Sequence, residues 1–539
     1  MFRGTIAGLI VCLAAGCGRV TAEPASPSEV AERQPPAAST APLPATSSGA
    51  RAAGPTAASI PTNSTAAREV AAVAPAAETA LASTRPGEDW PQFLGPRDNG
   101  VSAETGLLQE WPAEGPPLLW HRKLGEGYAP PSVRGERLIV QHRLRDREIV
   151  ECLHAHTGET LWKYDYETDF TDPYGYNGGT RCAPVISATR VYTFGPQGKL
   201  LCLELDSGNK MWERDTRAEF DVPEHFFGAG CTPILDGNKL IVLVGGQPNS
   251  AVVAFDAQTG KTLWEAAGKD TWNGVPTDER GGRPFRWSKG EMLVSYSSPL
   301  IAAIHGKRHL LCLLRQGLAS LDPDTGATNF RYWFRSRTHE SVNAARPVVV
   351  DDYIFLSAAY ETGAALLRVK PSGKEFEVVW RKPEGMATHW STAIHHQGYV
   401  YGFSGRHEPE ARLQCIALAT GELQWETSGF ERDLNDLEQD PLTGRIRDKT
   451  TGKFIPWPFY GRGSAILADG KLIVLGERGT LALVELNAER WVERARTSYP
   501  QIGYPSWAAP ILSRGRLYLR AERNVVCLDL RAPEAAPRQ

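Results

Sequence analysis

The chain has 539 residues and a formal net charge of -3, with acidic and basic residues interspersed. This balance supplies no basic face for nucleic acid and no polybasic segment for anionic lipid, which argues against both kinds of partner. The 15 Trp, 52 Gly and 39 Pro, against only four Met, favour an all-β chain rich in turns over a helical one.

The first 17 residues have the pattern of a bacterial signal peptide. Arg3 precedes an apolar run over residues 4–16 that is too short to span a bilayer. Small residues lead into Cys17, and this end resembles the lipobox at which lipoproteins are cleaved and acylated. We therefore expect an exported protein, anchored by lipid at Cys17 to the periplasmic or cell-surface face of a membrane. Because Leu13 and Ala14 depart from the commonest lipobox, a secreted soluble form is the alternative.

Residues 18–87 are dominated by Ala, Pro, Ser and Thr, with almost no aromatic side chains. Such a composition buries too little apolar surface to offset the entropy of ordering. It predicts a disordered linker between the anchor and a folded domain over residues 88–530. The folded part begins at the aromatic cluster Asp89–Pro96, and residues 531–539 are predicted to be a disordered tail.

From residue 88 to 530 the sequence repeats. The clearest copy, residues 182–212, contains three short apolar runs, the turn Asp206-Ser207-Gly208 and a final segment with Trp212. Eight copies with a period of roughly fifty residues predict an eight-bladed β-propeller of four-stranded blades. The last copy lacks its Trp segment, whereas residues 118–124 provide one before the first copy. We expect these two ends to pair and to close the ring.

Two spacings exceed the period and predict surface insertions at 267–292 and 429–458. The acidic stretch Asp433–Asp440 lies in the second insertion and is interpreted as a solvated loop. Outside the signal peptide, four of the seven remaining cysteines recur at one position of the third strand, which predicts buried core residues without disulfides. These four are Cys152, Cys202, Cys415 and Cys527.

The repeats resemble those of the PQQ-repeat, quinoprotein alcohol dehydrogenase-like propellers, which include the BamB-type outer-membrane assembly lipoproteins. The resemblance covers residues 89–530 and rests on Gly-x-x-x-Trp ends such as Gly208 to Trp212. In that family the indole docks one blade onto the next. The resemblance therefore implies a structural, blade-docking role for Trp120, Trp162, Trp212, Trp264, Trp380 and Trp425.

The resemblance also raises the question of PQQ and calcium, which the quinoprotein enzymes bind. No Asp, Glu and Asn set in this chain matches the ligands of those enzymes, and no two cysteines are adjacent. Asp322–Gly326 is interpreted as a hairpin turn, because calcium needs six or more oxygen ligands. His154 and His156 share a strand face but lack a third ligand. No hydrolase, zinc-protease or phosphate-loop motif occurs, so we expect no catalytic residue, no metal and no cofactor.

The remaining candidate site is inferred from where its residues stand in the repeats. Residues just before the inner strands should rim one mouth of the central channel, where three Arg and several aromatic residues would suit an anion, a carbohydrate or an acidic peptide. Alternatively, these side chains fill the channel and pair with local carboxylates or carbonyls. The predicted ligand-binding residues are Tyr128, Arg181, Arg346, His389, Trp390, Arg462 and Trp507.

Taken together, these features predict a monomeric, non-catalytic lipoprotein of the cell envelope. It would act as a scaffold for an envelope protein or a small polar or anionic ligand, and the resemblance implies a role in outer-membrane protein assembly. One alternative is a PQQ-dependent quinoprotein oxidoreductase. The other is a carbohydrate-binding propeller that stacks sugars on Trp390 and Trp507.

Overall fold

The computed structural model describes residues 85–531 except 113, 224–226, 269–293, 295 and 339–340. These residues belong to one compact unit that spans 80–539. The predicted signal peptide, Cys17, nearly all of the linker and most of the first insertion lie outside the described residues. Within the described residues, no helix has the length and apolar character needed to cross a membrane.

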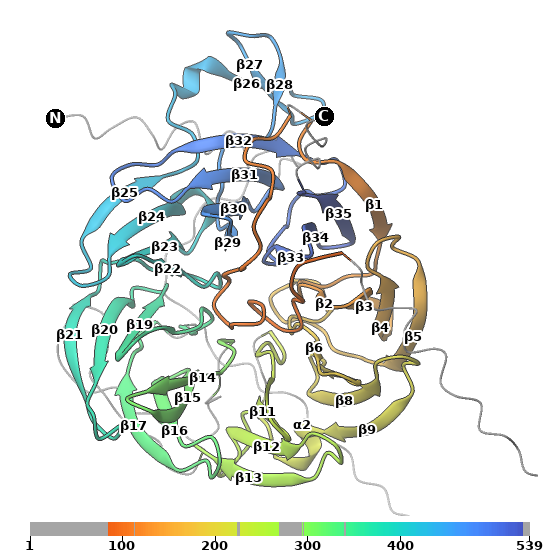
Figure 1. Cartoon of the computed structure of the whole chain (residues 1–539), viewed down its shortest axis with the longest axis vertical. Helices are drawn as coiled ribbons and strands as arrows, with labels where there is room; N and C mark the ends of the chain where they lie inside the picture. The colour runs from red at the N-terminus through yellow and green to blue at the C-terminus, as the bar shows by residue number, and fades with distance from the viewer. Residues whose placement is uncertain are drawn as a thin grey trace, which may run out of the picture. The chain divides into compact units, whose positions relative to one another are not determined.

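Eight four-stranded antiparallel sheets form the blades of a ring (Figure 1). In each blade the strands run in order from the centre of the ring to its edge. The first blade contains β2 (Ser132–Arg134), β3 (Arg137–Leu144), β4 (Arg147–His154) and β5 (Thr160–Glu167). The second contains β6 (Val185–Ile186), β7 (Arg190–Phe194), β8 (Lys199–Glu204) and β9 (Lys210–Asp215), and is followed by the short helix α2 (Thr216–Glu219).

The third to sixth blades repeat this arrangement. The third contains β10 (Ile234–Asp236), β11 (Lys239–Leu243), β12 (Val252–Asp256) and β13 (Thr262–Ala266). The fourth contains β14 (Leu300–Ile304), β15 (Lys307–Leu314), β16 (Gly317–Leu321) and β17 (Thr328–Trp333). The fifth contains β18 (Val348–Val350), β19 (Tyr353–Ala358), β20 (Gly363–Val369) and β21 (Phe376–Lys382). The sixth contains β22 (Ile394–His396), β23 (Tyr399–Ser404), β24 (Arg412–Ala417) and β25 (Leu423–Thr427), with the 3-10 turn η1 (Glu408–Glu410) between β23 and β24.

The last two blades close the ring. The seventh contains β29 (Ser464–Ala468), β30 (Lys471–Leu475), β31 (Thr480–Glu485) and β32 (Glu493–Ser498). The eighth joins both ends of the domain, with β33 (Ile511–Ser513), β34 (Arg516–Ala521), β35 (Asn524–Asp529) and β1 (Leu118–Lys123). In the β1–β35 pair, Trp120 lies opposite Cys527. The predicted all-β, eight-bladed propeller and its closure by an N-terminal strand are therefore confirmed.

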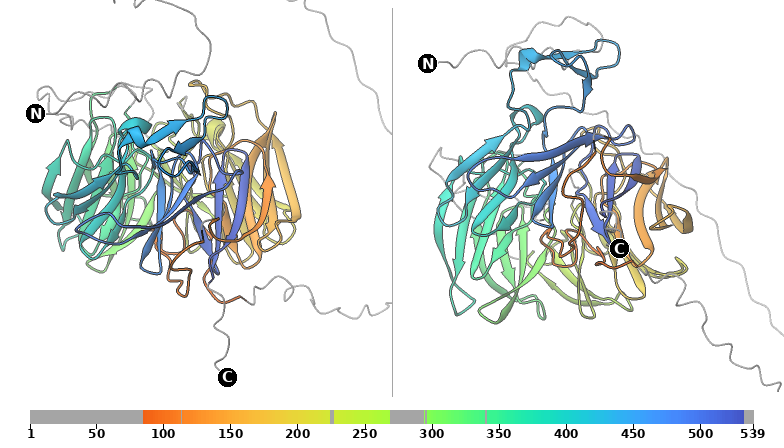
Figure 2. Two further views of the ribbon diagram at one scale, coloured as in Figure 1. Left: turned by 90° about the horizontal axis from the view of Figure 1, so that it is seen from above. Right: turned by 45° about the horizontal axis from the view of Figure 1, so that its top comes forward.

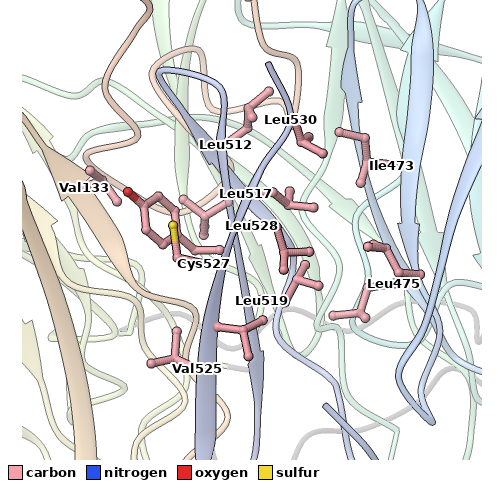
Figure 3. Close-up of a cluster of buried hydrophobic side chains, with 14 of the residues drawn as sticks. Val133, Ile473, Leu475, Leu512, Leu517, Leu519, Val525, Cys527, Leu528 and Leu530 are labelled. Atoms are coloured by element: carbon pink, nitrogen blue, oxygen red, sulfur yellow. The ribbon is translucent and has the colours of Figure 1, made fainter. Parts of the chain in front are cut away.

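Burial explains why the strands of one blade differ in sequence. The second strands β11 and β30 both read KLIVL and are buried from their second residue onward, because each blade packs between two others. The outer strand β9 is mostly exposed, and only Trp212 is buried in it. Figure 3 shows the shared core at the eighth blade, where Val133 of the first blade and Ile473 and Leu475 of the seventh pack around β34 and β35.

The outer-strand tryptophans join neighbouring blades. Trp162 lies on Gly208 in the turn of the second blade and donates its Nε1–H to Leu205 O at 2.9 Å. A Cβ on Gly208 would come within 2.4 Å of the indole, so only glycine allows this contact. Trp120, Trp212 and Trp380 repeat the arrangement, with Ala155, Ala257 and Leu418 as acceptors. Trp425 donates to Asn487 O, and Trp264 lies on Gly326.

The second insertion is a small sheet. The strands β26 (Leu437–Gln439), β27 (Ile446–Asp448) and β28 (Phe454–Ile455) pair in that order and project from the edge of the ring (Figure 1). The 3-10 turn η2 (Leu434–Asp436) precedes them. Residues 433–440 are exposed or half-buried, as expected for a solvated segment, but residues 437–439 form a strand and not a loop. Asp440 instead starts a hairpin, in which its side chain accepts a hydrogen bond from the Thr443 backbone N–H at 2.8 Å.

The N-terminal segment crosses the centre of the ring before it enters β1. Figure 1 shows this segment over the channel, and Figure 2 (left) shows it on the side of the ring opposite β26–β28. Trp90 exchanges backbone hydrogen bonds with Val133 of β2, and Ser102 N–H donates to Leu467 O of β29. Arg85 forms an ion pair with Asp529, three residues before the predicted start of the domain at 88.

Candidate functional site

A cavity of about 240 Å³ lies at the centre of the ring. Its walls come mainly from the loops that link the outer strand of one blade to the inner strand of the next. Small side chains such as Ser298, Ser391 and Ala465 supply part of the surface. The rings that line it are Phe93, Tyr128, Tyr176, Phe227, Tyr296, Tyr360, His389, Trp390 and Trp507.

These rings contact one another in a nearly continuous series. The Trp507 ring centroid lies 4.8 Å from that of Tyr128, 5.1 Å from that of Trp390 and 5.6 Å from that of Tyr176. The ring centroids of Tyr176 and Phe227 are 5.8 Å apart, and those of Phe227 and Tyr296 are 5.4 Å apart. Trp390 and Trp507 are only half-buried, so each keeps part of its surface for a ligand.

Glu477 holds the two tryptophans in place from behind. This buried carboxylate follows β30 and accepts a hydrogen bond from Trp507 Nε1 at 2.7 Å. It also forms an ion pair with Arg462. The Arg462 guanidinium lies 4.6 Å from the Trp390 ring centroid and 5.5 Å from that of Trp507. Arg462, predicted to bind ligand, therefore supports the indoles and is not on the cavity wall.

Arg181 does line the cavity, but its charge is already compensated. Its Nη2 lies 2.6 Å from the buried carboxylate of Asp172. The guanidinium stands 5.4 Å from the Tyr128 ring centroid and 5.6 Å from that of Phe170. Burial lowers the pKa of Arg181 and raises the pKa of Tyr128 to about 12, so the phenol is neutral.

Arg346 fixes the floor of the cavity. Its Nη1 lies 3.1 Å from the carboxylate of Asp98 and also donates to Phe93 O, while Nη2 donates to Pro299 O. Phe93 and Leu94 belong to the N-terminal segment and line the cavity on that side. Arg346 thus ties this segment to the blades and contributes no charge to the wall.

All three predicted arginines are therefore paired with a carboxylate. The arginines thus pair with local carboxylates, as in the second of the two arrangements that the sequence left open, but the side chains do not fill the channel. His389 adds no charge either: burial first, and then the charges of Arg462 and Arg406, lower its pKa to about 3. Its Nε2 lies 3.0 Å from the Tyr360 hydroxyl. Tyr128, Arg181, His389, Trp390 and Trp507 are brought together on one neutral, largely aromatic wall.

The wall does not fit PQQ held over calcium. Among the described residues, no Asp, Glu, Asn or Gln lines the cavity, whereas calcium takes carboxylate and carbonyl ligands. No group of three or more His, Cys, Asp or Glu in the described part of the chain is arranged to hold a metal ion. We therefore derive no reaction through that cofactor.

Sequence reasoning missed several lining residues. Tyr176 and Phe227 lie in blade-linking loops, nine and seven residues before the inner strand, where no repeat position marks them. Tyr360 lies in the loop between β19 and β20 of the fifth blade. Tyr296 stands four residues before β14, the same spacing as Trp507 before β33, so the repeat register could have found it. Phe93 belongs to the Asp89–Pro96 cluster, which the sequence marked as the start of the fold but not as part of a site.

The fold and the cavity define a β-propeller with an aromatic-lined central channel. The profile of the PQQ-type repeat family described as outer membrane protein assembly factor BamB matches residues 145–427, more than half of the chain. The chain therefore belongs to this family.

Individual relatives are more distant. Quinohemoprotein alcohol dehydrogenase ADH-IIG of Pseudomonas putida is 27% identical over 166 residues, and the match covers 26% of this chain and only 22% of that enzyme. The crystal structure of quinohemoprotein alcohol dehydrogenase from Comamonas testosteroni has a TM-score of 0.54 at 13% identity, covering 84% of this chain and 82% of the enzyme. BamB from Moraxella catarrhalis has a TM-score of 0.48 at 16% identity, covering 78% and 99%. At 13% identity the Comamonas testosteroni structure shows a shared fold alone.

Proposed function

We propose that this protein is a non-catalytic binding scaffold of the cell envelope. The observation that carries the proposal is the cavity wall, on which aromatic rings gather without a carboxylate, a metal-binding group or an uncompensated cation among the described residues. A concave, mostly apolar site with a few polar groups is the usual form of a small-molecule binding site. The described wall carries serine and threonine hydroxyls and the His389 imidazole, but no carboxylate or metal-binding cluster that would activate them.

The proposal places the protein outside the cytoplasm, anchored by lipid at Cys17 with residues 18–87 as a tether. Membership of a family named for outer membrane protein assembly supports the envelope location and a role in that assembly. The partners that we propose are an envelope protein on the propeller surface and a small ligand in the cavity. The propeller would act as a monomer, without nucleic acid.

The alternative function is a PQQ-dependent oxidoreductase. The names of the two quinohemoprotein relatives favour this alternative. Asp172 and Glu477 are already engaged with Arg181 and Arg462, so neither carboxylate is available for calcium without breaking a buried ion pair. We propose that the cavity uses neither PQQ nor a metal.

A thermal-shift assay on the full chain tests the proposal. One arm adds the low-molecular-mass fraction of an envelope extract, and the other adds PQQ with calcium. A ligand at a hundred times its Kd adds about 2.7 kcal/mol of stability, which is readily measured as a shift in Tm. We expect a shift with the extract in the native chain that is absent in Trp507→Ala, and none with PQQ and calcium. A shift with PQQ and calcium would support the oxidoreductase.

A further inference from the structure

We propose that the cavity binds the terminal sugar ring of a neutral glycan, end-on. The inference rests on the proposed binding function and adds the class of ligand. Three properties of the cavity carry it: the ring surfaces on its wall, the pairing of its charges and its closed floor.

The ring surfaces suit a sugar. The π-face of an aromatic ring is electron-rich, and it attracts the polarised C–H groups on the apolar face of a pyranose. Trp390 and Trp507 provide two such surfaces whose centroids are 5.1 Å apart and whose planes are inclined by 54°. Tyr128 and Tyr176 extend the surface beside Trp507. Inclined platforms of this kind can contact a saturated ring on more than one side.

Hydroxyl groups on other parts of the cavity wall suit the polar edge of a sugar. Thr232 Oγ1, Ser298 Oγ and Thr392 Oγ1 each accept a hydrogen bond from a backbone N–H, at 2.9, 2.8 and 3.1 Å. All three side chains line the cavity. Within the described residues, none of the three hydroxyls donates its own proton to an acceptor. Each therefore keeps an O–H with which to donate to a ligand hydroxyl.

The charges select a neutral ligand. An acidic ligand would have to compete with Asp172 for Arg181, and with Glu477 for Arg462 behind the wall. A cationic ligand would lie beside the Arg181 guanidinium. Removing one partner of a buried ion pair is strongly unfavourable, so an acidic ligand would lose more by displacing Asp172 or Glu477 than it gains. A cationic ligand would be repelled by the guanidinium. A glycan without charged groups disturbs neither pair.

The closed floor favours binding by the end of a glycan. Phe93 and Leu94 lie across the channel on one side, where Arg346 holds their segment. A cavity of about 240 Å³ that is closed on this side admits the end of a glycan and not a chain passing through. Tyr176 and Tyr504 are 42% and 54% exposed, and Tyr504 lies 6.1 Å from Trp507. These two tyrosines are placed to contact a second ring.

The test is calorimetry on the full chain, purified in a detergent without a sugar headgroup. The ligands are glucose, galactose, mannose and N-acetylglucosamine, their di- and tetrasaccharides, and glucuronic acid as a charged analogue. We expect at least one neutral series to bind, with affinity rising from mono- to disaccharide and changing less than about twofold from di- to tetrasaccharide. The charged analogue should bind about tenfold more weakly or not at all.

Variants locate the binding. Trp507→Ala and Tyr176→Ala should each weaken binding of that sugar by about tenfold, because each removes a stacking surface. Tyr176 is exposed, so its variant keeps the fold. Trp491→Phe, outside the cavity, is the matched control and should bind normally.

Two outcomes would overturn the inference, and they differ in what they leave standing. If no neutral sugar binds at about 10 mM, while the envelope fraction still shifts the native chain and not Trp507→Ala, the ligand class is wrong but the binding function holds. If neither binds, the proposed function fails as well. Affinity that grows steadily with glycan length, or binding that survives both variants, would also contradict end-on binding in the cavity.

Discussion

The protein uses tryptophan in two different ways. At the blade junctions, Trp162 covers Gly208 and donates its indole N–H to a backbone carbonyl, so one ring face and the polar atom both have protein partners. In the cavity, Trp507 also donates its indole N–H, to Glu477, but the rings of Trp390 and Trp507 remain half-buried against Arg462. A tryptophan whose ring is covered by protein thus contributes to stability, whereas one whose ring is partly exposed in a cavity can bind a ligand. Substitution of a blade-docking tryptophan should therefore lower stability, and substitution of a cavity tryptophan should mainly lower ligand affinity.

The largest expected effect is on a blade-docking residue. Trp212→Ala removes a side chain that is 9% exposed, together with its hydrogen bond to Ala257 O. Truncation of a buried tryptophan costs about 3–5 kcal/mol, because the cavity left behind is not refilled. We expect a clear drop in Tm by calorimetry. A drop in Tm no larger than that of Trp507→Ala would contradict the distinction between blade-docking and cavity tryptophans.

Gly208→Ala tests the other half of the same contact. Gly208 has φ of +73° and its new Cβ would lie 2.4 Å from the Trp162 indole. We expect a loss of about 3 kcal/mol from the left-handed backbone and the steric overlap together. Gly237 is the matched control, since it has φ of +57° and a Cβ added there would meet no atom within 4 Å. Gly237→Ala should lose only about 1 kcal/mol in the same denaturation experiment. Equal losses would mean that the indole contact contributes nothing.

Glu148 is a buried residue of the first blade whose carboxylate forms no hydrogen bond with any described residue. Both of its carboxylate oxygens are buried and lack hydrogen bonds within the described residues. Its neighbours are Arg143 and Tyr166 across the sheet, with Arg181 and Arg520 from adjoining segments. Burial raises the pKa of Glu148 to about 7, against the opposing effect of the three arginines.

The raised pKa predicts a pH dependence. The folded state holds the Glu148 proton more tightly than the unfolded state, so this stability is fully present below about pH 4.5 and is lost as the pH rises through about 7. Glu148→Gln removes the loss. We expect the variant to gain about 2 kcal/mol over the native chain at pH 8 and to show no such gain at pH 4.5, in urea titrations at both values. The same difference at both pH values would contradict a buried, uncompensated carboxyl.

The repeats were enough to predict the fold because each copy contains residues that mark its turns and the end of its outer strand. The turn before Gly208 and the position of Trp212 recur, and the missing strand of the last copy points to the segment around Trp120. The four cysteines noted in the sequence lie opposite docking tryptophans in the sheet register, as Cys202 lies opposite Trp212. Such positions repeat because the blade geometry repeats.

The cavity could be predicted only in part. Residues at a fixed distance from an inner strand, such as Trp390 and Trp507, were found by their register. Arg462 occupies a similar position in its repeat. Its side chain instead pairs with Glu477, which comes from a different turn, and it therefore lies behind the indoles. No local pattern reveals a pairing between segments that meet only in the folded ring. The floor formed by Phe93 was missed for the same reason.

The central claim is that Trp507 contributes more to ligand binding than to stability. The measurement is a pair of melting curves for Trp507→Ala, without ligand and with the low-molecular-mass envelope fraction that shifts the native chain. We predict a loss of about 2 kcal/mol without ligand, smaller than that of Trp212→Ala, because the half-buried indole also loses its hydrogen bond to Glu477. We predict no increase in Tm when ligand is added. A variant that still shows the full increase in Tm would contradict the account.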